Sequence, residues 1–256
     1  MEIKKIAVRG GHTEKATGAS ALIDELTEDR KVKDAVIKYL RKLGYEVLDV
    51  TPSVNYTSNE STDLAYGVNK ANEWGADLFV SIHFNKAYDS YNGALGSEVC
   101  VYSENEIAQR VVNTLGALGF KNRGQKVRTN LYELKNTKMK AMIVETCFVE
   151  ATEDVELYKK LGADAIGKAI AEAIVNDKVS ESDTPVKKEE VSKPVQAPVS
   201  NTDDWVARLQ AECNKQGFSN QKIYIFLATG LNKGEPEFDE DEIIEKYEID
   251  INEARN

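Results

Sequence analysis

The chain has 256 residues and a formal net charge of −10, a length that suits one well-buried domain together with a smaller element. It contains no run of eighteen apolar residues, which excludes a transmembrane helix. Between positions 234 and 256, ten acidic residues stand against two basic ones, so this tail carries −8 of the charge. The remainder is nearly neutral, and charge therefore gives no argument for nucleic-acid binding.

Strand-like and helix-like patterns alternate from residue 3 to about residue 176. Within the first third of the chain, the pattern predicts a strand starting at residue 3, a helix near 27–43, a strand at 45–50, a helix near 60–74 and a strand at 76–83. Beyond it, we expect a strand at 97–102, a helix at 106–118, a short strand around 131–134, a strand at 141–146 and a helix at about 153–176. This alternation predicts an α/β fold with an open, mixed, mostly parallel sheet and helices on both faces.

The composition changes after this region. Residues 177–203 hold three of the five prolines and show no helical or strand period, which predicts a flexible linker. Residues 204–256 are too few for an independent core without help. We therefore expect a catalytic domain over 1–176, a linker over 177–203 and a partial or atypical C-terminal segment over 204–256.

The cysteines and the N-terminal residues indicate the cellular compartment in which the chain is made. Cys100, Cys147 and Cys213 are widely spaced and form no CxxC pair, so neither a disulfide framework nor a cysteine-only zinc site is expected. The sequence from Met1 runs straight into a strand-like segment and lacks a signal-peptide pattern. We therefore expect synthesis in the cytoplasm and, if the chain acts outside the cell, release by another route.

The chain has only two histidines, and each follows a strongly apolar strand-like run. His12 follows the first run, His83 closes the run at 76–83, and Glu145 holds a similar position in the run at 141–146. Ligands of open α/β sheets bind at the carboxyl ends of the strands. A single histidine there is usually a hydrogen-bonded structural residue, but two imidazoles and a carboxylate together indicate a catalytic metal site.

A catalytic zinc ion typically has three protein ligands and one open position. Four carboxylates precede or begin the first helix and could supply the third ligand, and spacing does not choose among them: Asp24, Glu25, Glu28 and Asp29. Acidic residues there are also common helix-capping residues. Glu145 suits a separate task, because a carboxylate close to the metal can take a proton from an activated water and pass it to the leaving group. The set predicts metal-assisted hydrolysis.

Three segments together resemble the zinc-dependent N-acetylmuramoyl-L-alanine amidases, and more narrowly the endolysins of clostridial phages and prophages: Gly10-Gly11-His12-Thr13, Ser81-Ile82-His83-Phe84-Asn85 and Ile143-Val144-Glu145-Thr146-Cys147-Phe148. The similarity covers about residues 3–176. It implies that His12, Glu25 and His83 bind one Zn²⁺ and that Glu145 is catalytic. It also implies a peptidoglycan substrate, cut at the amide between N-acetylmuramate and L-alanine with lysis of the cell wall.

The sequence also leaves two alternative functions open and suggests a role for the C-terminal segment. Another zinc peptidoglycan hydrolase, such as a stem-peptide carboxypeptidase, and an inactive wall-binding protein both fit parts of the pattern. Residues 205–214 resemble the start of a helical peptidoglycan-binding module, which implies a truncated wall-binding segment with an acidic tail. The stretch from residue 223 resembles the end of a Nudix hydrolase, but the glutamate-rich box is absent, so no Nudix activity is expected.

Overall fold

The computed structural model describes residues 3–56 and 59–179. The expected linker, apart from its first three residues, and the expected wall-binding segment at 204–256 lie outside this part of the chain. None of the helices that the structure describes is long and apolar enough to cross a lipid bilayer.

Six strands form one sheet, and six helices accompany them. The strands are β1 (Lys5–Gly10), β2 (Glu46–Asp49), β3 (Leu78–Asn85), β4 (Ser97–Val101), β5 (Asn122–Val127) and β6 (Lys140–Phe148). The helices are α1 (Glu25–Lys42), α2 (Glu60–Trp74), α3 (Glu106–Ala117), α4 (Tyr132–Asn136), α5 (Thr152–Leu161) and α6 (Ala163–Val175).

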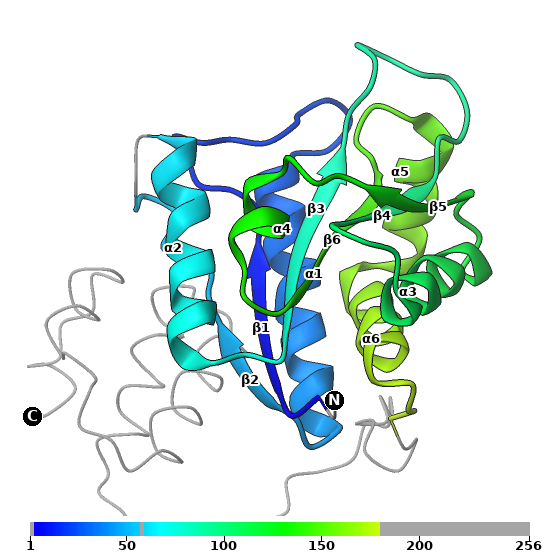
Figure 1. Cartoon of the computed structure of the whole chain (residues 1–256). Helices are drawn as coiled ribbons and strands as arrows, with labels where there is room; N and C mark the ends of the chain where they lie inside the picture. The colour runs from blue at the N-terminus through cyan, green and yellow to red at the C-terminus, as the bar shows by residue number, and fades with distance from the viewer. Residues whose placement is uncertain (1–2, 57–58, 180–256) are drawn as a thin grey trace, which may run out of the picture. The chain divides into compact units, whose positions relative to one another are not determined.

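The sheet is mixed and mostly parallel, as predicted, with the strand order β2-β1-β3-β6-β4-β5. β2, β1, β3 and β6 run in parallel, while β4 pairs with β6 in the antiparallel direction and with β5 in parallel. The carboxyl ends of β1, β3 and β6 therefore lie side by side at one edge of the sheet (Figure 1).

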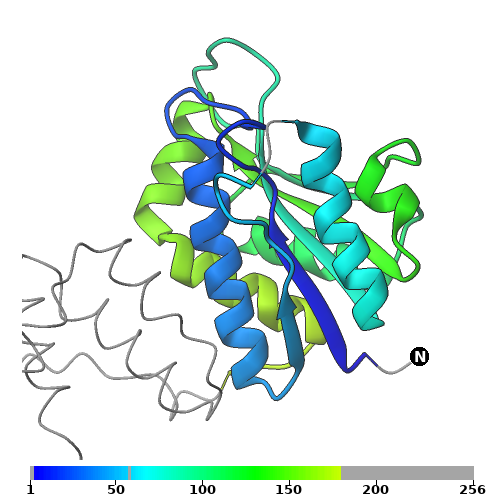
Figure 2. The same ribbon diagram turned by 90° about the vertical axis from the view of Figure 1, so that its left-hand side faces the viewer.

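Helices cover both faces of the sheet. Figure 2 shows α1 on one side of the strands and α2 on the other. Side chains alternate between the faces along each strand: Ile6 and Val8 join the core shared with α1, α3 and α6, whereas Ala7 packs in the smaller core that includes residues of α2 and α4. Along β3 and β6, every second residue likewise points toward the side of α2 and α4. Polar side chains from different strands can therefore meet on that side of the sheet.

Two expectations about single elements were wrong, and one strand was not predicted. Residues 131–134 do not form a strand, because α4 occupies Tyr132–Asn136; a short run of this kind does not distinguish helix from strand by its period. β5 was missed, since this edge strand is polar and mostly half-exposed and so lacks an alternating apolar pattern. The last helix is two helices, broken at Gly162, which has φ +80°.

The contact between α1 and α6 fixes the helix that carries Glu25. A Cβ atom at Gly167 in α6 would lie 2.4 Å from the Ala35 Cβ and 2.9 Å from the Val32 carbonyl oxygen of α1. The two helices can therefore approach this closely only because residue 167 has no side chain. Glycine normally destabilises a helix interior, so close packing accounts for its presence.

We expect Gly167→Ala to lower the free energy of unfolding by about 1–3 kcal/mol, because α1 backbone atoms must move to admit the methyl group. Chemical denaturation measures this change. Gly116→Ala in α3 is a matched control, since the atoms nearest to its methyl group would be those of the exposed Asn122 side chain, at 3.1 Å or more. Equal stability of Gly167→Ala and the unchanged protein would show that the helices do not depend on this close approach.

Candidate metal centre

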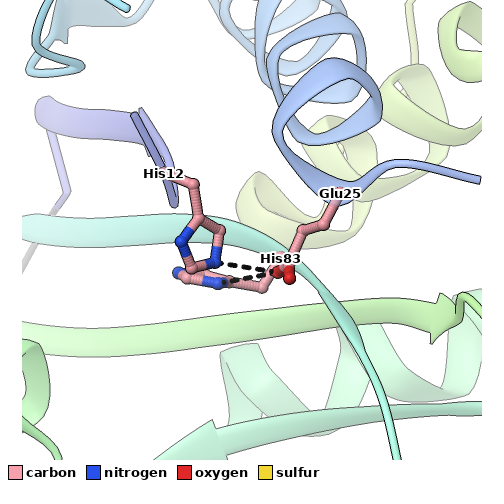
Figure 3. A group of neighbouring side chains, drawn as sticks. All are labelled: His12, Glu25 and His83. Carbon is pink, nitrogen blue, oxygen red and sulfur yellow. Dashed lines mark hydrogen bonds and ion pairs between the residues drawn. The ribbon is translucent and has the colours of Figure 1, made fainter. Parts of the chain in front are cut away.

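The carboxylate of Glu25, the first residue of α1, is the point at which the two histidines meet (Figure 3). Glu25 Oε1 lies 3.1 Å from His12 Nε2 and 3.1 Å from His83 Nδ1. One ligand atom from each of the three residues can be chosen so that all lie within 4.8 Å of one another. Two imidazole nitrogens and one carboxylate oxygen are the donor set of many catalytic zinc sites. The structure thus brings together the three residues expected to bind the metal.

His12 lies in the loop that follows β1. Its Nδ1 is 2.9 Å from the Ala16 carbonyl oxygen, to which it donates in the tautomer that leaves Nε2 free to face Glu25. Arg30 of α1 donates from Nη2 to the His12 carbonyl oxygen at 2.8 Å and to that of Pro52 at 3.1 Å. The loop is therefore fixed to neighbouring segments through its backbone, and the His12 ring keeps its orientation.

His83 lies inside β3 and not at its end, because the strand continues to Asn85. Its Nδ1 faces Glu25, and its Nε2 is 3.0 Å from the Ser81 hydroxyl oxygen on the same strand. The two imidazole rings meet edge to face, with ring centres 4.9 Å apart. His12 and His83 thus present different nitrogens, Nε2 and Nδ1, to the same carboxylate.

Two glycines leave the space that this cluster occupies. A Cβ atom at Gly11 would lie 2.1 Å from Cε1 of His83, and one at Gly18 would lie 2.1 Å from Oε2 of Glu25 and 2.5 Å from Cδ2 of His12. Any side chain at either position would displace a member of the cluster. Together with the donor set, this close fit shows that the residues present suit a small metal ion.

The charges around the cluster also favour a cation. Burial alone would raise the pKa of Glu25, but hydrogen bonds from His12 and His83 outweigh burial and hold that pKa far below its usual value. Burial alone would lower the pKa of His83, yet Glu133 and Glu25 hold it well above its usual value. The two shifts are reciprocal, since the imidazoles stabilise the ionised form of Glu25 while the carboxylates stabilise positive charge on His83.

The other three carboxylates that could have supplied the third ligand have different contacts. Asp24 caps α1 by accepting from the Thr27 backbone N–H at 3.0 Å. Glu28 accepts from Lys31 at 2.9 Å and from the Tyr158 hydroxyl at 2.6 Å. The tertiary structure therefore separates Glu25 from these neighbours, which spacing along the sequence could not do.

Asp29 is the third of these carboxylates, and it supports the loop that carries His12. Its Oδ2 accepts from the Gly11 backbone N–H at 2.8 Å, while its Oδ1 is buried and has no hydrogen-bond partner among the described residues. Burial raises the pKa of Asp29 to about 7, against the opposing effect of His83. Asp29 therefore contacts the backbone beside the cluster and is not one of the three clustered residues.

Glu145 lies beside His83 on the neighbouring strand. The two residues are register partners in the β3–β6 pair, and both point toward the side of α2 and α4. The register shifts by one residue immediately afterwards, between the pairs His83–Glu145 and Asn85–Phe148, as is common next to active sites. Glu145 Oε2 is buried without a hydrogen-bond partner among the described residues, and burial raises its pKa to about 7, although His83 opposes the shift.

The sequence analysis missed a set of buried polar residues behind His83. Arg9 and Ser81 are fully buried, and Glu133 is 2 % exposed. Arg9 Nη1 lies 3.2 Å from Glu133 Oε1. The one available signal was an arginine inside the apolar first strand, since a charged residue there is costly unless it has a partner.

The chain matches the family model described as N-acetylmuramoyl-L-alanine amidase over residues 6–176. It is 50% identical over 194 residues to an uncharacterized protein of Clostridium perfringens (strain 13 / Type A), a match that spans 74% of this chain and 57% of the relative, so the chain spans little more than half the length of that protein. It is 31% identical over 180 residues to the N-acetylmuramoyl-L-alanine amidase CwlM of Bacillus licheniformis, covering 67% of this chain and 66% of CwlM.

A solved structure agrees with these sequence matches. The catalytic domain of the CD27L endolysin, which targets Clostridia difficile, superposes with a TM-score of 0.62 at 30% sequence identity, covering 69% of this chain and 99% of that domain. The family match spans more than half of the chain, and its range includes the four candidate residues His12, Glu25, His83 and Glu145. The chain therefore belongs to the N-acetylmuramoyl-L-alanine amidase family.

Proposed function

We propose that the chain is a zinc-dependent N-acetylmuramoyl-L-alanine amidase that cuts the amide between N-acetylmuramate and L-alanine in peptidoglycan and so lyses the cell wall. The observation that carries this proposal is the convergence of His12, Glu25 and His83 at the carboxyl edge of the sheet, with Glu145 in register beside His83. The resemblance to an endolysin catalytic domain supports the lytic role. The enzyme would act on the wall after release from the cell.

His12, Glu25 and His83 would hold the metal through Nε2, a carboxylate oxygen and Nδ1 respectively. A bound zinc ion would polarise the scissile carbonyl and activate a water molecule for attack on it. The protein's own contribution is to fix these ligands before substrate arrives. It does so through the Ala16 and Phe84 backbones, which contact His12 and Glu25.

Glu145 has the position required of a proton carrier. As general base it would take a proton from the attacking water, and as general acid it would deliver that proton to the nitrogen of the departing L-alanine. Its Oε2 has no hydrogen-bond partner among the described residues, so no protein contact competes for this oxygen. Asn85 and Arg123 donate to both oxygens of the neighbouring Glu98, whereas Oε2 of Glu145 accepts from no group in the described part of the chain.

Digestion of purified clostridial peptidoglycan tests the reaction. We expect a chelator to abolish release of products and added zinc to restore it, with a new N-terminal L-alanine amine and an intact glycan among the products. Release of amino acids from the carboxyl end of the stem peptide would instead identify a carboxypeptidase. Binding to sacculi without any product would identify an inactive wall-binding protein.

Glu25→Gln should abolish tight zinc binding, because a neutral amide replaces the anionic ligand at the centre of the cluster. The metal content of the purified protein, measured by atomic absorption, checks this. Glu28→Gln is the matched control three residues along α1, and it should retain about one zinc per chain. Stoichiometric zinc in Glu25→Gln would remove Glu25 from the ligand set.

Glu145→Gln should retain zinc and the fold but lose roughly 100- to 10,000-fold of the hydrolytic rate, the usual contribution of a general acid–base group. Initial rates of amine release, measured together with zinc content and melting temperature, separate loss of catalysis from loss of metal. A variant that hydrolyses the wall at the unchanged rate would show that another group carries the proton.

A further inference from the structure

A chain of buried polar groups leads away from His83 on the side of the sheet that faces α2 and α4. His83 Nε2 is 3.0 Å from the Ser81 hydroxyl oxygen, and that hydroxyl donates to Glu133 Oε1 at 3.2 Å. The second oxygen of Glu133, Oε2, lies 3.7 Å from His83 Nε2, beyond direct hydrogen-bond length. Ser81 therefore bridges the imidazole and the carboxylate.

The protonation states of these groups fix which group donates and which accepts in each hydrogen bond. An ionised carboxylate can only accept, so the Ser81 hydroxyl must donate its proton to Glu133. The Ser81 oxygen then accepts from His83 Nε2–H. When His83 gives up the Nδ1 proton that it donates to Glu25, the neutral imidazole keeps its proton on Nε2 and has its lone pair on Nδ1. The hydrogen bonds through Ser81 to Glu133 thus select the tautomer of His83 that can bind a metal.

Arg9 contacts Glu133, the last group in this series of hydrogen bonds. Its guanidinium lies 3.2 Å from Glu133 Oε1 and donates to the Asp63 carboxylate at 3.0 Å, with both ion pairs buried. The same side chain donates to the carbonyl oxygens of Gly10 and Gly11 at 3.0 and 2.9 Å. One buried cation therefore ties the Glu133 carboxylate to the backbone immediately before His12.

A glycine in α2 leaves room for this cation. A Cβ atom at Gly67 would lie 2.9 Å from Cδ and 3.1 Å from Nη1 of Arg9. Gly67 lies in the interior of a helix, where glycine is normally unfavourable, and it is buried. The space in front of α2 is therefore shaped around the guanidinium.

We propose that Ser81 and Glu133 are positioning residues for His83, with Arg9 fixing the Glu133 carboxylate, and that they set the metal affinity of the site. This inference rests on the proposed zinc function. Partners of this kind behind a metal-binding histidine fix its tautomer and orientation, and their loss commonly costs 10- to 100-fold in metal affinity. None of the three residues belongs to the cluster that would hold the metal, so their effect on it would pass through the His83 ring.

Zinc titration of the full chain tests the proposal, with the dissociation constant measured by competition against a chromophoric chelator. The variants are Ser81→Ala, which removes the bridging hydroxyl, and Glu133→Gln, which removes the charge at the end of the bridge. Tyr158→Phe is the matched control, since it deletes one hydroxyl of a buried residue that donates to a carboxylate, Glu28, outside the cluster. The visible spectrum of the cobalt-substituted protein reports the ligand geometry independently of activity.

We expect the zinc dissociation constant to rise about 10- to 100-fold in Ser81→Ala and in Glu133→Gln, with an altered cobalt spectrum, and to stay unchanged in Tyr158→Phe. If Ser81→Ala folds and binds zinc and cobalt as the control does, the positioning role is refuted even where Glu133→Gln unfolds because Arg9 has lost a partner. Absence of zinc binding by the unchanged protein would refute the proposed function as well, whereas tight binding unaffected in both variants would refute this inference alone.

Discussion

The Glu25 carboxylate is the contact on which the arrangement of this site depends. Its Oε2 accepts from the Ala19 backbone N–H at 2.6 Å, and its Oε1 accepts from the Phe84 backbone N–H at 2.8 Å as well as contacting both histidines. Because a buried carboxylate is costly unless it is paired, the loop after β1, the start of α1 and the carboxyl-terminal part of β3 converge on one point. The close contact between α1 and α6 holds the helix that supplies this group.

The same residue type has two different environments at this site. Glu25 is surrounded by hydrogen-bond donors, so its pKa is depressed and it remains a carboxylate suited to binding a cation. Glu145 is half-buried, its buried Oε2 has no hydrogen-bond partner among the described residues, and burial raises its pKa to about 7. Environments that separate the pKa values of two carboxyl groups in this way also separate their chemical roles.

The two faces of the sheet have different roles in the domain. The face toward α1, α3 and α6 is lined by apolar side chains that form the main core. The opposite face carries apolar residues at one end and, toward the carboxyl ends of the strands, the buried Arg9, Ser81 and Glu133 behind His83. Alternation along β1 and β3 puts Arg9 and Ser81 on this side, and α4 supplies Glu133. The site is therefore supported by hydrogen bonds from that side and by packing from the other.

Much of the architecture could be predicted from the sequence, because strongly periodic apolar segments report directly on burial. The predicted positions of β1, β3, β6, α1, α2 and α3 agree with the structure to within a few residues. β5 and α4 could not be predicted, because a polar edge strand has no buried face to leave a pattern and a five-residue helix is too short to show a period. Gly162 was also passed over as a break, although its positive φ ends α5.

For the site, the sequence by itself determined that the two histidines and Glu145 follow strand patterns whose carboxyl ends meet, since parallel strands bring such residues together. Spacing left four carboxylates open for the third ligand, and only the family resemblance favoured Glu25. The tertiary structure separated them, because Asp24, Glu28 and Asp29 each contact a different group while Glu25 contacts both histidines. It alone revealed Arg9, Ser81 and Glu133 behind His83, because contacts between residues 9, 81 and 133 depend on strand order and side-chain direction, which no local pattern records.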